Sequence, residues 1–330
     1  MNFGAEGHSR LAETIMPMLA RILPCRMWPV FFGALSLAQA AGFSNEPPVK
    51  PDHIAIHVNS DLVQIPVTVL DHDNRFVAGL DKESLRLFDD RVEQVITHFA
   101  MEDAPLSIGF VFDASASMHY KMQQSREAVT SFLKTTNPGD EVFLVEFNDH
   151  VELAVDPSAS TQEIQTQLKS SGPPQPLLDA VDFSISRMKK PTNARKALII
   201  ISDGGDNCSR YTMAELKNLV RETDVQVYAL GIFNSREKRS QIPEELYGPS
   251  LLRGVTKQSG GHLFEIADVN QLPDVASKIG AALRAQYVLG YSPKVTRDGK
   301  YHRVEVKLAQ PKGSRKLQAS WRHGYYAPVE

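Results

Sequence analysis

The sequence predicts an α/β fold with a doubly wound, mostly parallel sheet, joined to a smaller all-β, sandwich-like domain. Over residues 106–286, short apolar runs alternate with segments of helical spacing, a pattern typical of a parallel sheet covered by helices on both faces. The segments on either side have strand-like patterns only. With 330 residues and 42% hydrophobic content, the chain has room for one large domain and one small domain.

The charge balance excludes one class of function. The formal net charge is -3, and the chain has no long block of Lys and Arg. A nucleic-acid-binding protein normally carries a basic patch that matches the phosphate backbone. We therefore expect no nucleic-acid partner.

Residues 1–40 are predicted to be a cleaved secretory signal peptide. Arg21 and Arg26 precede the apolar run 28–37, which is too short to cross a bilayer. The small-x-small pattern at 38–40 suits signal peptidase. An uncleaved anchor is the alternative, and only then is a membrane contact expected. The mature protein is expected to be secreted, or periplasmic within the cell envelope.

Four further segments follow the leader. Residues 41–52 are Pro-rich and polar, which indicates a linker. Residues 53–103 form an N-terminal β segment, 104–285 the α/β domain, and 286–330 a C-terminal β segment. Neither β segment is long enough to bury much surface alone. We therefore expect the two to pair into one domain, with the α/β domain inserted between them.

Hydrophobic periodicity places the individual elements. In the α/β domain, buried strands are short apolar runs, and helices show apolar residues three or four positions apart. Strands are expected at 107–112, 141–147, 151–155, 196–202, 225–233 and 261–266, and helices at 122–136, 161–170, 177–190, 213–223 and 272–286. In the flanking segments, strands are expected at 63–71, 85–90, 92–100, 287–293, 301–309 and 316–326.

Oxygen-bearing side chains gather where two of these strands end. Asp113 ends the first strand of the α/β domain, Ser115 and Ser117 follow at alternate positions, and Asp203 comes directly after the strand at 196–202. Parallel strands present their carboxyl ends, where ligands bind, at one edge of the sheet. Alternate positions of an extended loop face the same side. These hard oxygen donors suit Mg²⁺, or Mn²⁺ or Ca²⁺, better than Zn²⁺.

The motif DASAS at 113–117, together with ISDGGDN at 201–207, resembles the metal-ion-dependent adhesion site (MIDAS) of a von Willebrand factor type A (VWA) domain, which has a Rossmann-like fold. The flanking segments resemble the VWFA-related family abundant in acidobacteria. The resemblance implies that Asp113, Ser115 and Ser117 hold the cation and that Asp203 accepts hydrogen bonds from metal-bound water. It also implies a protein partner whose carboxylate completes the coordination.

One position departs from the family pattern. The remaining family ligand is a threonine in a GGT segment, four residues before an aspartate that opens a helix. The corresponding segment here reads PPQPLLDA and places Gln175 at that position. We expect the glutamine carbonyl to serve as an oxygen ligand, bound to the cation directly or through water.

Simpler roles are open for several of these polar residues. Ser115 and Ser117 are also suited to cap the helix that follows them. Asp206 and Asn207 suit turn hydrogen bonds, and Asp179 suits the start of its helix. Metal binding and these structural roles make different demands on side-chain geometry.

The sequence contains no set of catalytic residues. GxSxG, HExxH and GxxxxGK[ST] are absent. We therefore expect a protein that is not an enzyme: an exported VWA-domain protein that binds a protein partner through a MIDAS, in adhesion or complex assembly. Two alternatives stay open. One is a divalent-metal-dependent hydrolase or its accessory subunit, and the other is a structural envelope module with an empty site.

Overall fold

The computed structural model describes residues 62–155, 176–233, 243–293, 297–309 and 317–329. Four predictions fall outside these ranges, namely the leader, the linker, the helix at 161–170 and the ligand Gln175. Within the described ranges, no helix is both long enough and apolar enough to cross a membrane.

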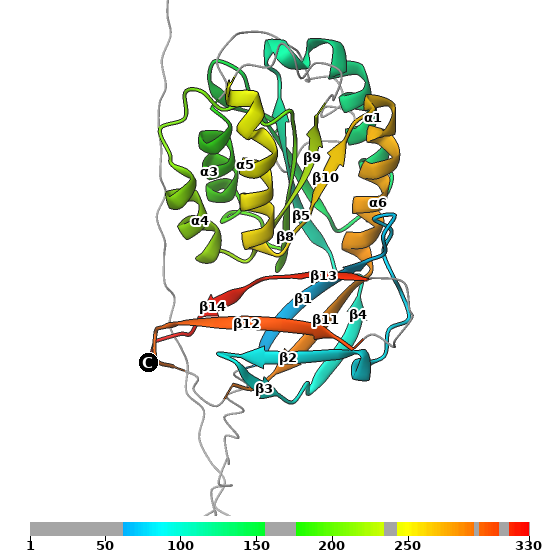
Figure 1. Cartoon of the computed structure of the whole chain (residues 1–330), viewed down its shortest axis with the longest axis vertical. Coiled ribbons are helices and arrows are strands. Elements are labelled where there is room, and N and C mark those ends of the chain that lie inside the picture. Colours follow the sequence, from blue (N-terminus) through cyan, green and yellow to red (C-terminus); the bar gives the residue numbers. More distant parts are fainter. Residues whose placement is uncertain (1–61, 156–175, 234–242, 294–296, 310–316, 330) are drawn as a thin grey trace, which may run out of the picture. The chain divides into compact units, whose positions relative to one another are not determined.

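The larger domain is built on a six-stranded sheet with the strand order β10-β9-β8-β5-β6-β7 (Figure 1). All neighbouring strands are parallel except β6 and β7 at one edge. This sheet confirms the predicted α/β class. Its strands are β5 Leu106–Asp113, β6 Glu141–Phe147, β7 Val151–Val155, β8 Arg195–Ser202, β9 Val225–Ile232 and β10 Leu263–Ile266.

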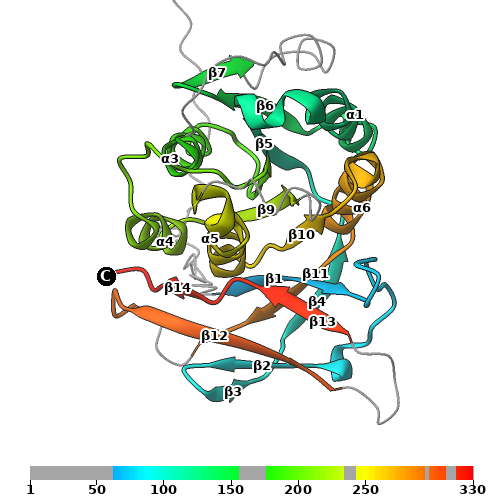
Figure 2. The same cartoon turned by 45° about the horizontal axis from the view of Figure 1, so that its top comes forward.

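Helices cover both faces of this sheet, as a doubly wound fold requires (Figure 2). One face packs against α1 (Met122–Leu133) and α6 (Leu272–Arg284). The other packs against α3 (Leu177–Arg187), α4 (Met213–Arg221) and α5 (Pro243–Ser259). The sequence pattern did not predict α5, whose helical periodicity is weak and which contains Pro249. Two short 3₁₀ helices, Lys82–Ser84 and Val269–Gln271, lie in connecting segments.

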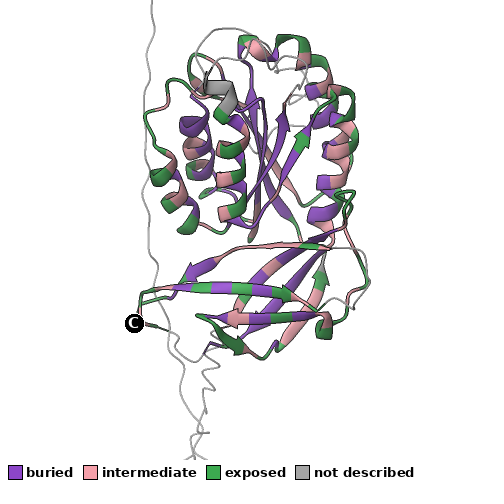
Figure 3. Ribbon diagram, viewed as in Figure 1, coloured by how far each residue is buried: buried purple, intermediate pink, exposed green. Residues whose placement is uncertain are grey.

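The central strands explain why the apolar runs lack alternation. Every residue of β5 and of β9 is buried, and Figure 3 shows buried residues along the middle of the sheet. A strand buried on both faces has no solvent side, so its sequence is mostly apolar rather than apolar at every second position. The first polar side chains after such a strand therefore mark the edge of the sheet.

The flanking segments form two four-stranded antiparallel sheets, with the orders β13-β1-β11-β4 and β14-β12-β2-β3. In the first sheet, β1 from the N-terminal flank pairs with β11 from the C-terminal flank. Between the two sheets lies a core of their apolar side chains. The strands are β1 Val63–Leu70, β2 Leu85–Asp89, β3 Val92–Gln94, β4 His98–Glu102, β11 Gln286–Tyr291, β12 Tyr301–Leu308, β13 Gln318–Trp321 and β14 Gly324–Tyr326.

Two predicted strands are each divided in the structure. Residues 92–100 give β3 and β4, and residues 316–326 give β13 and β14. In both cases the first and second halves belong to different sheets, so the chain turns from one layer to the other between them. Local alternation of apolar and polar residues does not encode which sheet a strand joins.

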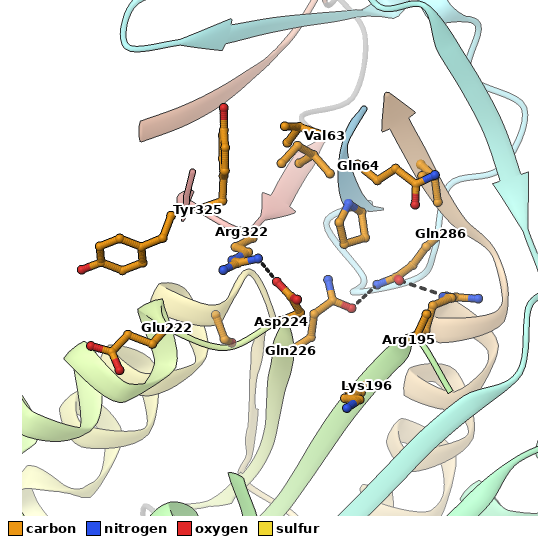
Figure 4. Close-up of a pocket in the computed structure, with 16 residues that line it drawn as sticks. Val63, Gln64, Arg195, Lys196, Glu222, Asp224, Gln226, Gln286, Arg322 and Tyr325 are labelled. Carbon is orange, nitrogen blue, oxygen red and sulfur yellow. Dashed lines mark hydrogen bonds and ion pairs between the residues drawn. The ribbon is translucent and has the colours of Figure 1, made fainter. Parts of the chain in front are cut away.

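A buried polar network connects the sandwich to the six-stranded sheet of the larger domain (Figure 4). Gln286 is the first residue of β11. Its side-chain nitrogen Nε2 lies close to three oxygen atoms: Gln226 Oε1 at 2.7 Å, Thr68 Oγ1 at 2.9 Å and the Tyr228 hydroxyl at 3.1 Å. The side-chain oxygen Oε1 of Gln286 accepts a hydrogen bond from the Arg195 guanidinium at 3.0 Å. Because Gln286 is 1% exposed, water does not replace these bonds.

We predict that Gln286→Leu lowers the free energy of unfolding by about 1–3 kcal/mol, because buried polar groups on both sides lose their partner. Urea unfolding at equilibrium measures the difference. The matched control is Gln318→Leu on β13, where the side chain is exposed and the expected change is within about 0.5 kcal/mol. Equal losses in the two variants would contradict a structural role for the network.

Candidate metal-binding site at the carboxyl edge of the sheet

The carboxyl ends of β5 and β8 bring the predicted acidic residues to one edge. The two strands are parallel neighbours, with Phe112 opposite Ile201. Asp113 ends β5, and Asp203 follows the last residue of β8. From β5, the sheet continues to β6 on one side and to β8 on the other, so this edge is the switch point where doubly wound folds bind ligands.

The loop after β5 brings the two serine hydroxyls together. Their oxygens lie 3.1 Å apart, and the backbone N–H of Ser115 donates to Asp113 Oδ1 at 3.0 Å. The sequence suggested an extended loop, but the loop is extended only in part. Ser115 is extended, whereas Ser117 lies in the 3₁₀ helix η2 (Ala116–Lys121). The first turn of this helix brings the second hydroxyl back toward the first.

The structure gives no support to the capping role for Ser115. It occupies the N-cap position of η2, but its side chain forms no capping hydrogen bond. Ser117 lies inside η2, and the residue before α1 is Lys121. The Ser115 hydroxyl is instead directed toward that of Ser117, which leaves oxygen lone pairs available to a ligand.

Asp113 is a fully buried carboxylate beside a second one. Burial raises the pKa of Asp113 well above its ordinary value, and the negative charge of Asp203 acts in the same direction. Hydrogen bonds from Ser115 and Ser202 oppose this shift; the Ser202 hydroxyl donates to Asp113 Oδ2 at 2.6 Å. Two nearby buried carboxylates are stable in their charged forms only beside a cation.

An ammonium group supplies one positive charge at this edge. Lys121 Nζ donates to Asp203 Oδ2 at 2.8 Å, and the two side chains are only 13% and 7% exposed. Neither Lys121 nor Ser202 was predicted from the sequence. The available signals were weak: Ser202 directly precedes the predicted acidic residue, and Lys121 follows the serines by about one helical turn.

Two other acidic residues have structural roles. Asp206 Oδ1 accepts a hydrogen bond from Ser209 within its own turn, as predicted, and another from the backbone N–H of Leu177 at the start of α3. Asp179 lies in the first turn of α3, where the sequence placed it, and its carboxylate also accepts the backbone N–H of Arg210 at 2.9 Å. Together they attach the loop after β8 to α3.

The assembled donor set fits a hard divalent cation. Asp113, Ser115, Ser117 and Asp203 offer only oxygen atoms, and these are the ligands that Mg²⁺, Ca²⁺ and Mn²⁺ prefer. The ammonium of Lys121 shows that the edge already attracts positive charge. Gln175, the fifth predicted ligand, lies outside the described residues.

A sizeable cavity in the described part of the chain lies elsewhere. It has a volume of about 520 Å³, and its lining includes Arg195 and Gln226 from the starts of β8 and β9, with Asp224, Gln286 and Arg322 (Figure 4). The starting ends of parallel strands are opposite to the edge that carries Asp113. This cavity belongs to the junction with the sandwich and is separate from the candidate metal site.

The larger domain is therefore a doubly wound α/β domain with an oxygen-rich loop at its switch point, where domains of this class bind ligands. The model of the von Willebrand factor type A domain family matches residues 107–278, and the chain belongs to this family. The match covers the described elements from β5 to most of α6.

Individual relatives are distant. An uncharacterized protein of Borreliella burgdorferi is 21% identical over 188 residues, and the match covers 50% of this chain and 55% of the relative, so the chain spans about half of that protein. A von Willebrand factor type A structure from Catenulispora acidiphila is 14% identical with a TM-score of 0.46 and covers 82% of this chain and 75% of that one. Proximal thread matrix protein 1 from the mussel byssus is 17% identical with a TM-score of 0.46, covering 58% and 49%.

We predict that Lys121→Met destabilises the protein in the presence of EDTA by about 3 kcal/mol, as expected when one partner of a largely buried ion pair is removed. Added Mg²⁺ should restore more stability to this variant than to the wild type, because the ion then supplies the missing charge. Thermal and urea unfolding measure both effects. Lys134→Met, an exposed change after α1, is the control. If the two variants behave alike, the ion pair has no such role.

Proposed function

We propose that this chain is an exported VWA-domain protein that binds a protein partner through a divalent cation held in a MIDAS, in adhesion or in the assembly of a complex. The observation that supports this most directly is the convergence of two buried carboxylates and two adjacent hydroxyls at the switch point of the sheet. Membership of the VWA family supports the same reading.

In this proposal, Asp113, Ser115, Ser117 and Gln175 hold the cation, and Asp203 accepts hydrogen bonds from its water ligands. Mg²⁺ is the preferred ion, with Mn²⁺ or Ca²⁺ as substitutes, because all donors are oxygens. The bound ion would accept a carboxylate oxygen from the partner as a further ligand.

The chain's own residues prepare the site. Ser202 and the backbone of Ser115 each donate to one oxygen of Asp113 and fix the orientation of its carboxylate. Lys121 neutralises Asp203, so it limits the charge repulsion between the two carboxylates when no metal is bound. In the metal-bound protein, the ammonium of Lys121 and the cation would both offset the negative charge of the two carboxylates.

We further propose that the leader at 1–40 directs the protein to the cell exterior or envelope and is then removed. The boundaries proposed for the mature chain are 41–52 for the linker, 53–103 and 286–330 for the two β segments, and 104–285 for the VWA domain. The antiparallel pairing of β1 with β11 supports a shared domain for the two flanks.

Binding of Mg²⁺, measured by calorimetry, is expected for the wild type and is expected to weaken at least tenfold in Asp113→Ala, because the charged ligand at the centre of the site is lost. Asp73→Ala, a change in an exposed acidic turn, is the matched control and should bind as the wild type does. The absence of binding heat in the wild type would favour the structural envelope module. Phosphatase or protease activity on generic substrates would favour the metal-dependent hydrolase.

A partner captured from an envelope extract should remain bound in Mg²⁺ and be released by EDTA. It should not be captured by Asp113→Ala, and free acetate at high concentration should compete for it, because the proposed contact is a carboxylate. Capture that is indifferent to EDTA and to Asp113→Ala would mean that the partner binds elsewhere, even if the metal site itself exists.

A further inference from the structure

A second cluster of potential metal ligands lies in the β-sandwich. Asp89 is the last residue of β2, and Asp90 follows it in the turn before β3. Strand β12 is the antiparallel neighbour of β2 and contributes His302; Figure 1 shows the two strands side by side. The cluster therefore joins the N-terminal flank to the C-terminal flank.

The spacing of the three side chains suits a small metal ion. His302 Nδ1 lies 3.1 Å from Asp90 Oδ2 and 3.7 Å from Asp89 Oδ1, and the three ligand atoms all lie within 4.8 Å of one another. Bonds from Zn²⁺ to nitrogen and oxygen are about 2.0–2.2 Å, which separates neighbouring ligand atoms of a tetrahedral ion by roughly 3.3 Å. The two measured distances lie on either side of that value.

One oxygen of Asp89 gives a second, independent indication of a cation site. The side chain is 7% exposed, and its Oδ2 accepts hydrogen bonds from the hydroxyls of Tyr291 at 3.0 Å and Tyr325 at 3.2 Å. Oδ1 is buried and has no hydrogen-bond partner among the described residues. It faces His302 Nδ1 at a distance too long for a hydrogen bond. A buried carboxylate oxygen without a donor is unfavourable unless a cation contacts it.

The surrounding groups hold the three side chains in place. His302 Nε2 lies 3.1 Å from Asp298 Oδ1, which is the carboxylate–histidine contact that orients imidazole ligands toward metals. The imidazole ring also stacks on Tyr325, with centroids 5.4 Å apart and an interplanar angle of 19°. Asp90 is 56% exposed and gives an ion access from solvent.

We propose that Asp89, Asp90 and His302 form a second metal site that binds Zn²⁺ or a similar late divalent first-row ion. One imidazole with two carboxylates suits Zn²⁺, whereas the all-oxygen set around Asp113 suits Mg²⁺. Three protein ligands leave a fourth position for water or for a group of a partner. Because the ligands come from both flanks, a bound ion fastens β2 to β12. This site is independent of the function proposed for the VWA domain.

Another acidic cluster of the described chain supplies a control, and a proton on His302 is the alternative to a metal ion. The residues Asp71, His72 and Asp73 also lie close together, but His72 is exposed, and Arg75 already bonds both carboxylates. His72→Ala therefore removes a histidine of similar acidic surroundings outside the proposed site. A second proton on His302 is the alternative occupant, because an imidazolium would satisfy the same carboxylates.

The test uses the full chain with Cys25→Ser and Cys208→Ser, because either thiol of the sequence would also take up Zn²⁺. Zn²⁺ binding is followed by calorimetry, and Co²⁺ binding by its visible absorption. We expect His302→Ala to abolish one binding event and Asp90→Asn to weaken it at least tenfold, while His72→Ala and Asp113→Ala retain it. Zn²⁺ should also raise the melting temperature of the wild type but not of His302→Ala.

Asp90→Asn protects the test against misfolding, because Asp90 has a positive φ of 46°, a conformation that asparagine adopts readily. Zn²⁺ binding that is unchanged in both His302→Ala and Asp90→Asn would overturn the proposal. A wild type that binds no Zn²⁺ would also overturn it, and would leave a protonated His302 as the group that satisfies the carboxylates.

Discussion

The position of one carboxylate at the end of a fully buried strand constrains the rest of the VWA domain. Strand β5 is covered on both faces, so Asp113 enters the carboxyl edge from the core and is itself fully buried. Burying a carboxylate is unfavourable unless donors and positive charge surround it. The hydroxyl of Ser202, the N–H of Ser115 and the ammonium of Lys121 are arranged around this edge in a way that meets that requirement.

The same constraint makes the candidate site unfavourable in energy when no cation is bound. The oxygen atoms that would bind a cation are also the atoms that make the empty edge unfavourable. The ion pair of Lys121 with Asp203 lowers this energetic cost, because it places a positive charge beside one of the two carboxylates. A divalent ion would bring more positive charge into the site and, like the ammonium, would offset the negative charge of the two carboxylates.

The β-sandwich depends on contacts between residues far apart in the sequence. Gln286 begins β11 shortly after α6 ends, where the VWA domain passes into the C-terminal flank, and its side-chain amide contacts Thr68 from β1 and Gln226 from β9. The cluster of Asp89 and His302 connects the flanks again on the other sheet. Each contact holds together two parts of the chain that could not bury their apolar faces separately.

The sequence by itself determined the class of fold and where the oxygen-bearing side chains of the candidate site begin, because strand ends follow from apolar runs that stop at a polar residue. Asp113 and Asp203 were predictable for that reason. Only the tertiary structure decided that Ser117 lies in a 3₁₀ turn, that Lys121 pairs with Asp203, and that the segments 92–100 and 316–326 each divide between two sheets. Periodicity reports the faces of an element, whereas these features depend on which distant strand or side chain lies beside it.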